Sequence, residues 1–365
     1  MRNTAVRLDK VPEPPGCSVL GNAPLSDPPA EGVRVRRPTL HAVAARAGVS
    51  KSSVSRVING EPTVAPEIRQ IVMAAVTELG YVPNGAARNL VTQKTNTIAI
   101  IVSDPPAGLV SDDPMFAMVV RAASRELEAA GKQVALVLAG SDESRRRVEQ
   151  YLAAGHVDGA MLVSMDGSDP LPAVLARTGL PVVSHGRLAT PGLMPYVDND
   201  NLGGATKAVQ HLLDQGRQRI ATISGPLDMQ AAQERLNAYR QALKDTGRRS
   251  IVALGDFTRI SGAEAMRQLL DDDPQLDAVF AANDLMAIGA LRTLREAGRR
   301  VPEDVAVVGF DDIEAALYTA PPLTTVRSPM GEQAARTVRL LLELLANGSA
   351  DSVILPTEIV IRESA

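Results

Sequence analysis

Short apolar runs alternate with amphipathic stretches from Thr97 onward, and this alternation limits the fold more than any other feature. Apolar runs separated by helical periods predict parallel sheets that are covered by helices on both faces. There are too many runs for one small doubly wound domain, so we expect two α/β lobes. The predicted strands are Ile98–Val102, Val134–Leu138, Ala160–Val163, Pro181–Ser184, Ile220–Ser224, Ile251–Leu254, Ala278–Ala281 and Val305–Gly309. The helices expected among them include Met115–Ala130, Ser144–Ala154, Ala205–Gln215, Ala231–Asp245, Gly262–Leu270 and Leu285–Glu296.

An all-helical segment precedes this region. Thr39 is a good N-cap for a first helix, and a tight glycine turn then leads to Ser50, which can cap a second helix. Pro66 suits the first position of a third helix, which Gly80 closes. Two helices joined by a glycine turn, with a small polar exposed face, are typical of a helix-turn-helix. The side chains expected on that exposed face are Lys51, Ser52, Ser53, Ser55 and Arg56.

Composition excludes several classes of protein. Residues 1–37 are rich in proline and lack apolar periodicity, so we expect a disordered extension. Cys17 is the only cysteine, which excludes a disulfide framework and a Cys-based zinc site, and the four histidines lack metal-ligand spacing. The chain has no phosphate-binding GxxxxGK[ST] loop, HExxH motif or GxSxG elbow, so we expect no cofactor, metal or catalytic residue.

The charge is distributed unevenly along the chain. From 38 to 94 there are six basic and three acidic residues, whereas from 95 onward there are 26 basic and 35 acidic residues. A basic head on an acidic body suits a protein that meets a polyanion at one end. No apolar run reaches membrane-spanning length, and the N-terminus lacks the apolar core of a signal peptide. We therefore expect a cytoplasmic, nucleoid-associated protein with no membrane partner.

The segment after the third helix makes a resemblance specific. Asn84 can cap a short helix that ends at Leu90, and a polar linker follows to Asn96. The sequence TLHAVAARAGVSKSSVSRVING followed by YVPNGAARNL resembles the head and hinge of the LacI/GalR (lactose-repressor) family of transcription regulators. The remainder resembles the effector-binding core of that family along its full length.

This resemblance implies an all-α helix-turn-helix head with a hinge helix, followed by a two-lobed α/β core like that of periplasmic binding proteins. We expect the DNA-binding domain at 38–83, the hinge helix and linker at 84–96, and the effector-binding and dimerisation core at 97–365. Three crossings would join the lobes, near Tyr196, Val326 and Gly348. The first lobe would then cover about 97–196 and 327–348, and the second about 197–326 and 349–365.

The resemblance also implies which residues contact DNA. Lys51, Ser52 and Arg56 are expected to touch base edges or flanking phosphates in the major groove, because Arg and Lys read guanine well. Leu90 would wedge into a central minor-groove step and kink the duplex. Small alanines in the hinge helix let two such helices approach, which predicts a homodimer on a palindromic operator. The other residues assigned to this interface are Thr39, Ser50, Ser53, Ser55, Asn59, Asn84 and Ala87.

Effector contacts are implied in the same way. Arg235 in ERLNAYR matches the effector-binding arginine of the family, and further contacts fall at the carboxyl ends of strands, where ligands bind in open α/β sheets. An arginine and a carboxylate can grip neighbouring hydroxyls while an aromatic covers the ring face, so a mono- or oligosaccharide is expected. The other residues assigned to this site are Phe116, Phe257, Asn283, Asp284 and Asp311, with Asp166, His185 and Arg187 on the first-lobe rim.

We therefore expect a sequence-specific DNA-binding regulator, a repressor of sugar uptake or catabolism genes whose operator affinity is controlled by a carbohydrate. A purine- or nucleoside-sensing repressor that needs a corepressor is one alternative. A solute-binding protein for transport is another, although the helix-turn-helix pattern argues against it. The sequence leaves open the identity of the effector, its action as inducer or corepressor, the operator, and the choice between dimer and tetramer.

Overall fold

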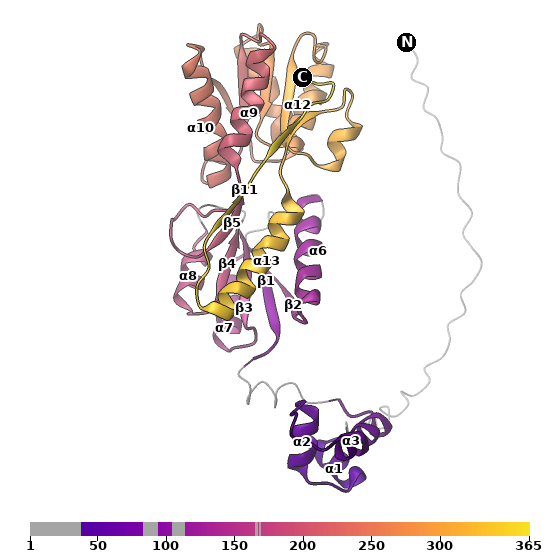
Figure 1. Ribbon diagram of the computed structural model, residues 1–365. Coiled ribbons are helices and arrows are strands. Elements are labelled where there is room, and N and C mark those ends of the chain that lie inside the picture. Colours follow the sequence, from indigo (N-terminus) through magenta and orange to yellow (C-terminus); the bar gives the residue numbers. More distant parts are fainter. Residues whose placement is uncertain (1–37, 83–93, 104–113, 165–166, 168) are drawn as a thin grey trace, which may run out of the picture. The chain divides into compact units, whose positions relative to one another are not determined.

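The computed structural model describes residues 38–82, 94–103, 114–164, 167 and 169–365 (Figure 1). The chain divides into two compact units, a small helical unit that ends at Asn84 and a large α/β unit that begins at Gly85. Among the described helices, none combines the length and the apolar character needed to cross a bilayer.

The small unit consists of three helices, α1 (Leu40–Ala47), α2 (Lys51–Ile58) and α3 (Pro66–Leu79). Their expected ends are confirmed. The Thr39 hydroxyl accepts the amide of Ala42 at 3.3 Å, and the Ser50 hydroxyl accepts the amide of Ser53 at 3.1 Å. These bonds satisfy amides that have no partner inside the helix. The helices enclose a small core that includes Val43, Ala47, Val54, Val57, Val72 and Ala75.

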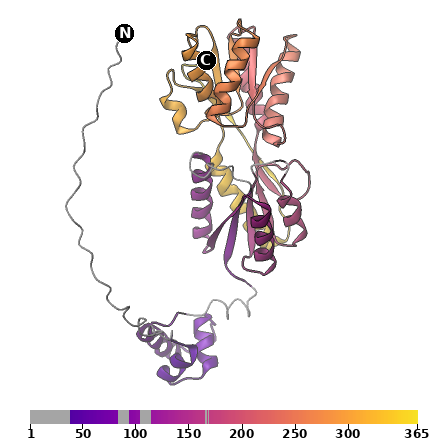
Figure 2. The same cartoon turned by 180° about the vertical axis from the view of Figure 1, so that it is seen from behind.

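The large unit contains two lobes, each built on a six-stranded sheet within the part of the chain that the structure describes. The first sheet has the order β11-β5-β4-β3-β1-β2, and all of its described pairings are parallel. Its strands are β1 (Thr97–Ser103), β2 (Gln133–Ala139), β3 (Gly159–Ser164), β4 (Val182–His185), β5 (Tyr196–Asn199) and β11 (Val353–Leu355). Both views of the ribbon show helices over its two faces (Figures 1 and 2), namely α6 (Pro114–Ala129), α7 (Asp142–Ala153), α8 (Leu171–Arg177) and α13 (Met330–Asn347).

The second sheet has the order β12-β10-β9-β8-β6-β7, and only its pairing between β10 and β12 is antiparallel among the described strands. Its strands are β6 (Ile220–Ser224), β7 (Ile251–Leu254), β8 (Ala278–Ala281), β9 (Ala306–Asp311), β10 (Thr324–Arg327) and β12 (Glu358–Val360). The helices packed on it are α9 (Asn201–Asp214), α10 (Gln230–Asp245), α11 (Arg259–Asp272) and α12 (Asp284–Glu296), and a short 3₁₀ helix spans Glu314–Tyr318.

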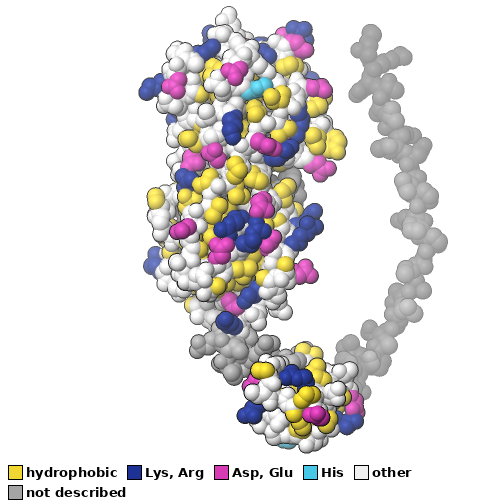
Figure 3. Space-filling model, in the orientation of Figure 1, with side chains coloured by type: hydrophobic (Ala, Val, Ile, Leu, Met, Phe, Trp, Pro, Cys, Tyr) yellow, Lys and Arg dark blue, Asp and Glu magenta, His cyan; other side chains and the backbone are white. Residues whose placement is uncertain are grey.

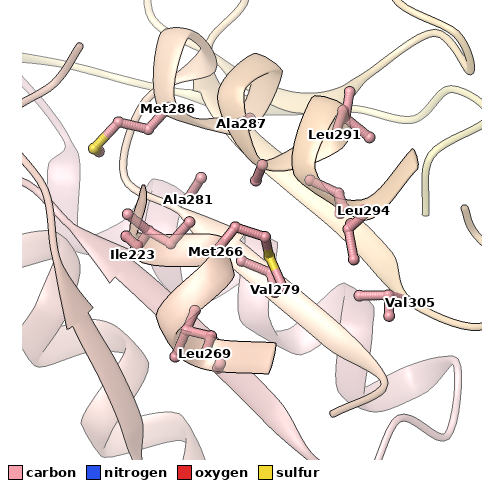
Figure 4. Close-up of a cluster of buried hydrophobic side chains, with 14 of the residues drawn as sticks. Ile223, Met266, Leu269, Val279, Ala281, Met286, Ala287, Leu291, Leu294 and Val305 are labelled. Carbon is pink, nitrogen blue, oxygen red and sulfur yellow. The ribbon is translucent and has the colours of Figure 1, made fainter. Parts of the chain in front are cut away.

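Apolar side chains explain why the helices pack on these sheets. In the second lobe, Met266 and Leu269 of α11 and Leu294 of α12 lie over the strands (Figure 4), where they are at most 1 % exposed. Ile223 of β6 and Val279 of β8 meet them from the sheet and are fully buried. Removing this much apolar surface from water stabilises each lobe by roughly 1.5–3 kcal/mol per large side chain.

The surface of the first lobe carries ion pairs. Arg336 of α13 pairs at 2.8 Å with Glu343, two turns further along the same face of the helix, and Arg339 pairs with Glu126 of α6 at 3.0 Å. Figure 3 shows such basic and acidic side chains close together on this lobe. Charges of both signs lie side by side here, so this face has no strong single-sign field.

Sheet pairing corrects the expected lobe boundaries. Strand β5 pairs with β4 and β11 in the first sheet, so the first crossing follows Asn199 rather than Tyr196. Strand β11 belongs to the same sheet, so the last crossing follows Leu355 and not Gly348. The second crossing lies just after Arg327, the last residue of β10, close to the expected position. Both displaced boundaries involve strands of three or four residues, and runs this short give a weak periodic signal.

One expected burial pattern is also corrected. Strand β2 is an edge strand, and Val134, Leu136 and Leu138 are 37 to 46 % exposed instead of buried. In α3, Ile71 is 48 % exposed, whereas the neighbouring Val72 is fully buried in the small core. Adjacent residues of a helix point about 100° apart, so the two cannot both face the core of a three-helix unit.

Candidate nucleic-acid interface and effector site

The exposed face of α2 carries the expected DNA-reading residues. Lys51, Ser52 and Arg56 are exposed, whereas Ser53 and Ser55 are half-buried. Arg56 lies 3.7 Å from Glu61, and both side chains are largely exposed, so this ion pair is weak and leaves the guanidinium accessible. Lys51 in the first turn of α2 and Arg56 in its last turn can contact both phosphates and base edges.

The remaining expected DNA contacts have different positions. Thr39 and Ser50 are exposed at the helix starts, and their hydroxyls already cap α1 and α2. Asn59 is exposed at the end of α2, with its amide 3.5 Å from the Ser55 hydroxyl. Asn84, Ala87 and Leu90 lie outside the described residues, so the hinge contacts stay predictions.

A cavity lies between the two lobes of the large unit. First-lobe strands β3, β4 and β5 and the start of α13 line one side, and second-lobe residues from α10, β9 and the loops before α11 and α12 line the other. Of the nine expected effector contacts, six line this cavity: His185, Arg187, Arg235, Phe257, Asn283 and Asp311. The topology thus brings residues that are far apart in the sequence to one place.

Arg235 forms the polar floor of the cavity on the second lobe. Its Nε donates to Asn201 Oδ1 at 3.0 Å and its Nη1 donates to the Ala282 carbonyl at 2.5 Å. The guanidinium lies 3.7 Å above the centre of the Phe310 ring, a stacked arrangement that favours a cation. Burial lowers the pKa of Arg235, and the nearby carboxylate of Asp311 opposes this effect.

Asp311 completes this part of the site. Its Oδ1 lies 3.5 Å from Arg235 Nη2, so the two side chains present a cation and an anion to the same space. Its backbone φ of 108° is in a region that non-glycine residues rarely adopt. Such strain is concentrated at functional sites, where the surrounding structure holds it.

Phe257 supplies the apolar surface and also has a positive φ, of 69°. Its carbonyl accepts a hydrogen bond from Asn283 Nδ2 at 2.9 Å, while Asn283 Oδ1 caps α12 by accepting the amide of Met286 at 2.9 Å. The ring packs on Gly225, where a Cβ atom would lie 2.2 Å from it. Asn283 and Gly225 therefore hold the aromatic ring in place.

His185 and Arg187 stand on the opposite, first-lobe wall. Burial lowers the pKa of His185 to about 4, so its imidazole is neutral at physiological pH, and its Nδ1 lies 3.5 Å from the Thr337 hydroxyl. Arg187 Nη1 lies 2.7 Å from Glu234 Oε1, which belongs to α10 of the second lobe. The wall thus offers a neutral ring and a cation that is paired across the cavity.

Comparison with known proteins gives this arrangement its context. Residues 39–84 match the model of the bacterial regulatory proteins of the lacI family, and residues 209–365 match that of a periplasmic binding protein-like domain. The HTH-type transcriptional regulator CelR of Thermobifida fusca is 47 % identical over 338 residues, which cover 91 % of this chain and 99 % of CelR.

The chain belongs to the LacI family of bacterial regulatory proteins.

Other members of the family agree with this assignment. The ribose operon repressor of Escherichia coli K12 is 36 % identical over 83 % of this chain and 92 % of its own length. The structure of a transcriptional regulator CelR–cellobiose complex matches 90 % of this chain and 100 % of its own, with a TM-score of 0.71 and 44 % identity. The lac repressor dimer bound to operator and the anti-inducer ONPF matches 90 % of this chain and 99 % of its own, with a TM-score of 0.79 and 29 % identity. The chain is thus a DNA-binding transcription regulator with the expected fold.

Two described residues expected from the family resemblance do not line the cavity. Asp284 is fully buried beneath it, where its carboxylate accepts from the Thr325 hydroxyl at 2.5 Å and the Ile313 amide at 2.9 Å. Phe116 packs against the first-lobe core, and Met115 lines the cavity in its place because neighbouring helix positions point in different directions. Asp166 lies outside the described residues.

Sequence reasoning missed several polar residues of the cavity wall. Asn199 Nδ2 donates to Gln333 Oε1 at 2.8 Å, and Asn201 Nδ2 donates to Asp198 Oδ1 at 3.3 Å. All four side chains line the cavity. Asp198 and Asn199 end strand β5, and Asn201 is the first residue of α9. A polar run at the carboxyl end of a strand is the signal that would have found them, had β5 been recognised.

Proposed function

We propose that this protein represses genes for sugar uptake or catabolism and binds a palindromic operator as a homodimer. A carbohydrate in the cavity between the lobes controls its operator affinity. The single observation that carries the sugar proposal is the Arg235–Asp311 pair beside the Phe257 ring in one cavity. A cation and a carboxylate can grip neighbouring hydroxyls while an aromatic ring covers the apolar face of a sugar.

The effector we propose is a β-linked glucose disaccharide, with cellobiose as the probe. The similarity to CelR and to its cellobiose complex supports this choice, because it extends over nine-tenths of the chain. The side chains we assign to the sugar are Arg235, Asp311, Phe257, His185 and Arg187, with Asn283 holding Phe257.

Control of DNA binding follows from a shift between two states of the core. A sugar that binds one arrangement of the lobes more tightly favours that arrangement by its difference in affinity. The fraction of dimers able to place both α2 helices in successive major grooves then changes. Such a regulator acts in the cytoplasm, associated with the nucleoid, and catalyses no reaction.

Fluorescence anisotropy with genomic fragments tests the proposal. We expect salt-sensitive binding of the full chain to a palindromic fragment, with cellobiose changing the dissociation constant several-fold. Phosphate contacts make binding weaken steeply with salt, which separates DNA binding from an artefact of aggregation. No binding to any fragment would exclude the regulator, and tight binding of purines without binding of sugars would exclude the carbohydrate effector.

A further inference from the structure

Two buried polar atoms of the first lobe lack a hydrogen bond from any described residue. They are Arg187 Nε and Asp198 Oδ2, and both residues line the cavity. The two atoms are 4.0 Å apart, which is too far for a hydrogen bond between them. Buried polar atoms without a partner are uncommon in proteins, and each one calls for an explanation such as a ligand.

The other polar atoms of both side chains are already engaged. Asp198 Oδ1 accepts the Asn199 amide at 2.9 Å and the Asn201 side chain at 3.3 Å. The Arg187 guanidinium lies 5.3 Å above the centre of the Tyr196 ring, and its Nη1 donates to Glu234 at 2.7 Å. These contacts hold the two side chains, and with them Nε and Oδ2, in fixed positions.

Glu234 reaches Arg187 from the other lobe. It belongs to α10, and its Oε1 also accepts from Gln230 Nε2 at 3.1 Å, which fixes the carboxylate. The Glu234 side chain is only 13 % exposed, and that of Arg187 is 33 % exposed, so this ion pair is screened less than one in open water. The position of Arg187 therefore depends on the lobes being close together.

We propose that one ligand hydroxyl bridges Arg187 and Asp198, and that Glu234 positions Arg187 for it from the opposite lobe. The hydroxyl donates its hydrogen to Asp198 Oδ2 and accepts a hydrogen bond from Arg187 Nε. A hydroxyl is both donor and acceptor, so it satisfies both atoms, whereas an ammonium or a carboxylate group satisfies only one of them. This inference rests on the proposed sugar effector and adds two residues to its site, Asp198 and Glu234.

The first lobe then matches the second, where Arg235 and Asp311 form a similar pair with 3.5 Å between their charged atoms. Each lobe presents one arginine–aspartate pair to the same cavity. A polyol that places a hydroxyl on each pair holds the two lobes together, whereas a ligand that reaches one pair does not. Ligand specificity and lobe closure are thereby linked through Arg187.

Calorimetry with the full chain, cellobiose and a series of monodeoxy cellobioses tests the bridging hydroxyl. Asp198→Asn keeps the internal contacts of Oδ1 and replaces the acceptor Oδ2 with a donor. We expect it to weaken cellobiose binding by roughly 10- to 100-fold. One monodeoxy derivative, which lacks the bridging hydroxyl, should already bind the wild type more weakly and lose little more in the variant. Asp214→Asn, at an exposed position on α9, is the control and should bind cellobiose as the wild type does.

Glu234→Gln tests positioning with the same ligands. We expect roughly a 3- to 10-fold loss of affinity for cellobiose and almost none for the derivative that lacks the bridging hydroxyl. Thermal unfolding followed by circular dichroism verifies that each variant is folded. A merely structural role would weaken the binding of every ligand in the series equally, and that result would overturn the proposal.

Two failures can be told apart. If the wild type binds cellobiose and Asp198→Asn binds it equally well, the bridging hydroxyl is wrong and the sugar effector stands. If the wild type binds no sugar, the proposed effector class is wrong, and this inference is wrong with it.

Discussion

At the scale of single residues, the cavity depends on positions that tolerate little change. Phe257 and Asp311 both have positive φ angles, and each is held by neighbours rather than by its own preference. Such positions are the ones where a small steric change alters ligand binding more than it alters folding.

Gly225 illustrates this sensitivity. We expect Gly225→Ala to lower sugar affinity by roughly 10-fold, because the new Cβ would lie 2.2 Å from the Phe257 ring and displace it. The matched control is Gly331→Ala in α13, where nothing lies within 4 Å of the added Cβ, so affinity should not change. Calorimetry with cellobiose measures both variants. Equal affinities for the two would show that the position of Phe257 does not matter for the ligand.

Asp284 makes a prediction about pH. Burial, with Asp311 nearby, raises the pKa of this carboxyl well above its usual 3.8. The folded state therefore binds the proton more tightly than the unfolded chain does, so stability from this group is complete below pH 3.8 and declines as pH rises through the folded pKa. Asp284→Asn removes the buried charge, while its amide can donate to the Thr325 hydroxyl and accept from Ile313.

Between pH 3.8 and the pKa of Asp284 in the folded protein, we expect the stability of Asp284→Asn relative to the wild type to increase with pH. The increase should reach up to about 1.4 kcal/mol per pH unit. Thermal unfolding of both proteins at a series of pH values from 4 to 8 measures the difference. A difference that does not change with pH would mean that Asp284 titrates normally in the folded protein.

At the scale of elements, one half-buried carboxylate joins the linker to the first lobe. Asp158, just before β3, accepts the Thr95 amide at 2.6 Å, the Thr95 hydroxyl at 2.9 Å and the Asn96 amide at 3.0 Å. Lys132, just before β2, lies 3.1 Å from it. Partial burial alone would raise the pKa of Asp158, but the hydrogen bonds from Thr95 and the contact with Lys132 outweigh it and lower the pKa.

This contact fixes the point at which the linker enters the core. We expect Asp158→Ala to leave cellobiose affinity within two-fold of the wild type, because the residue is not part of the cavity wall. We expect it to reduce the effect of cellobiose on operator affinity by roughly 3- to 10-fold, because movement of the lobe reaches the linker through these bonds. Anisotropy titrations with and without sugar measure this effect, and an unchanged sugar effect would rule out a role for Asp158 in coupling.

The strands show which elements the sequence can predict. Strands β6, β7 and β8 begin and end where expected, because each is a short apolar run between clear breaks. Strand β5 is YVDN, half polar, and gave no such signal. Missing it displaced a lobe boundary and hid Asp198, whose position follows from the strand. The expected contacts at Phe116 and Asp284 failed for a related reason, since a family motif gives a segment but not the direction of each side chain.

At the scale of the whole molecule, the DNA-reading face and the cavity belong to different compact units. Each activity should therefore be separable. We expect Lys51→Ala to weaken operator binding by roughly 10-fold and to reduce its salt dependence, because an exposed cation is lost, while sugar affinity without DNA stays the same.

Asp311→Asn should weaken sugar binding and leave operator binding as it is. Loss of its charge beside Arg235 should lower sugar affinity by at least roughly 10-fold and leave operator affinity without sugar unchanged.

In the wild type, sugar and operator should change each other's affinity by the same factor, roughly 5- to 150-fold, because coupling between two sites is reciprocal. Calorimetry of sugar binding to the free and the operator-bound protein gives one factor, and anisotropy with and without sugar gives the other. Two unequal factors would mean that a third state, such as a change of oligomer, takes part.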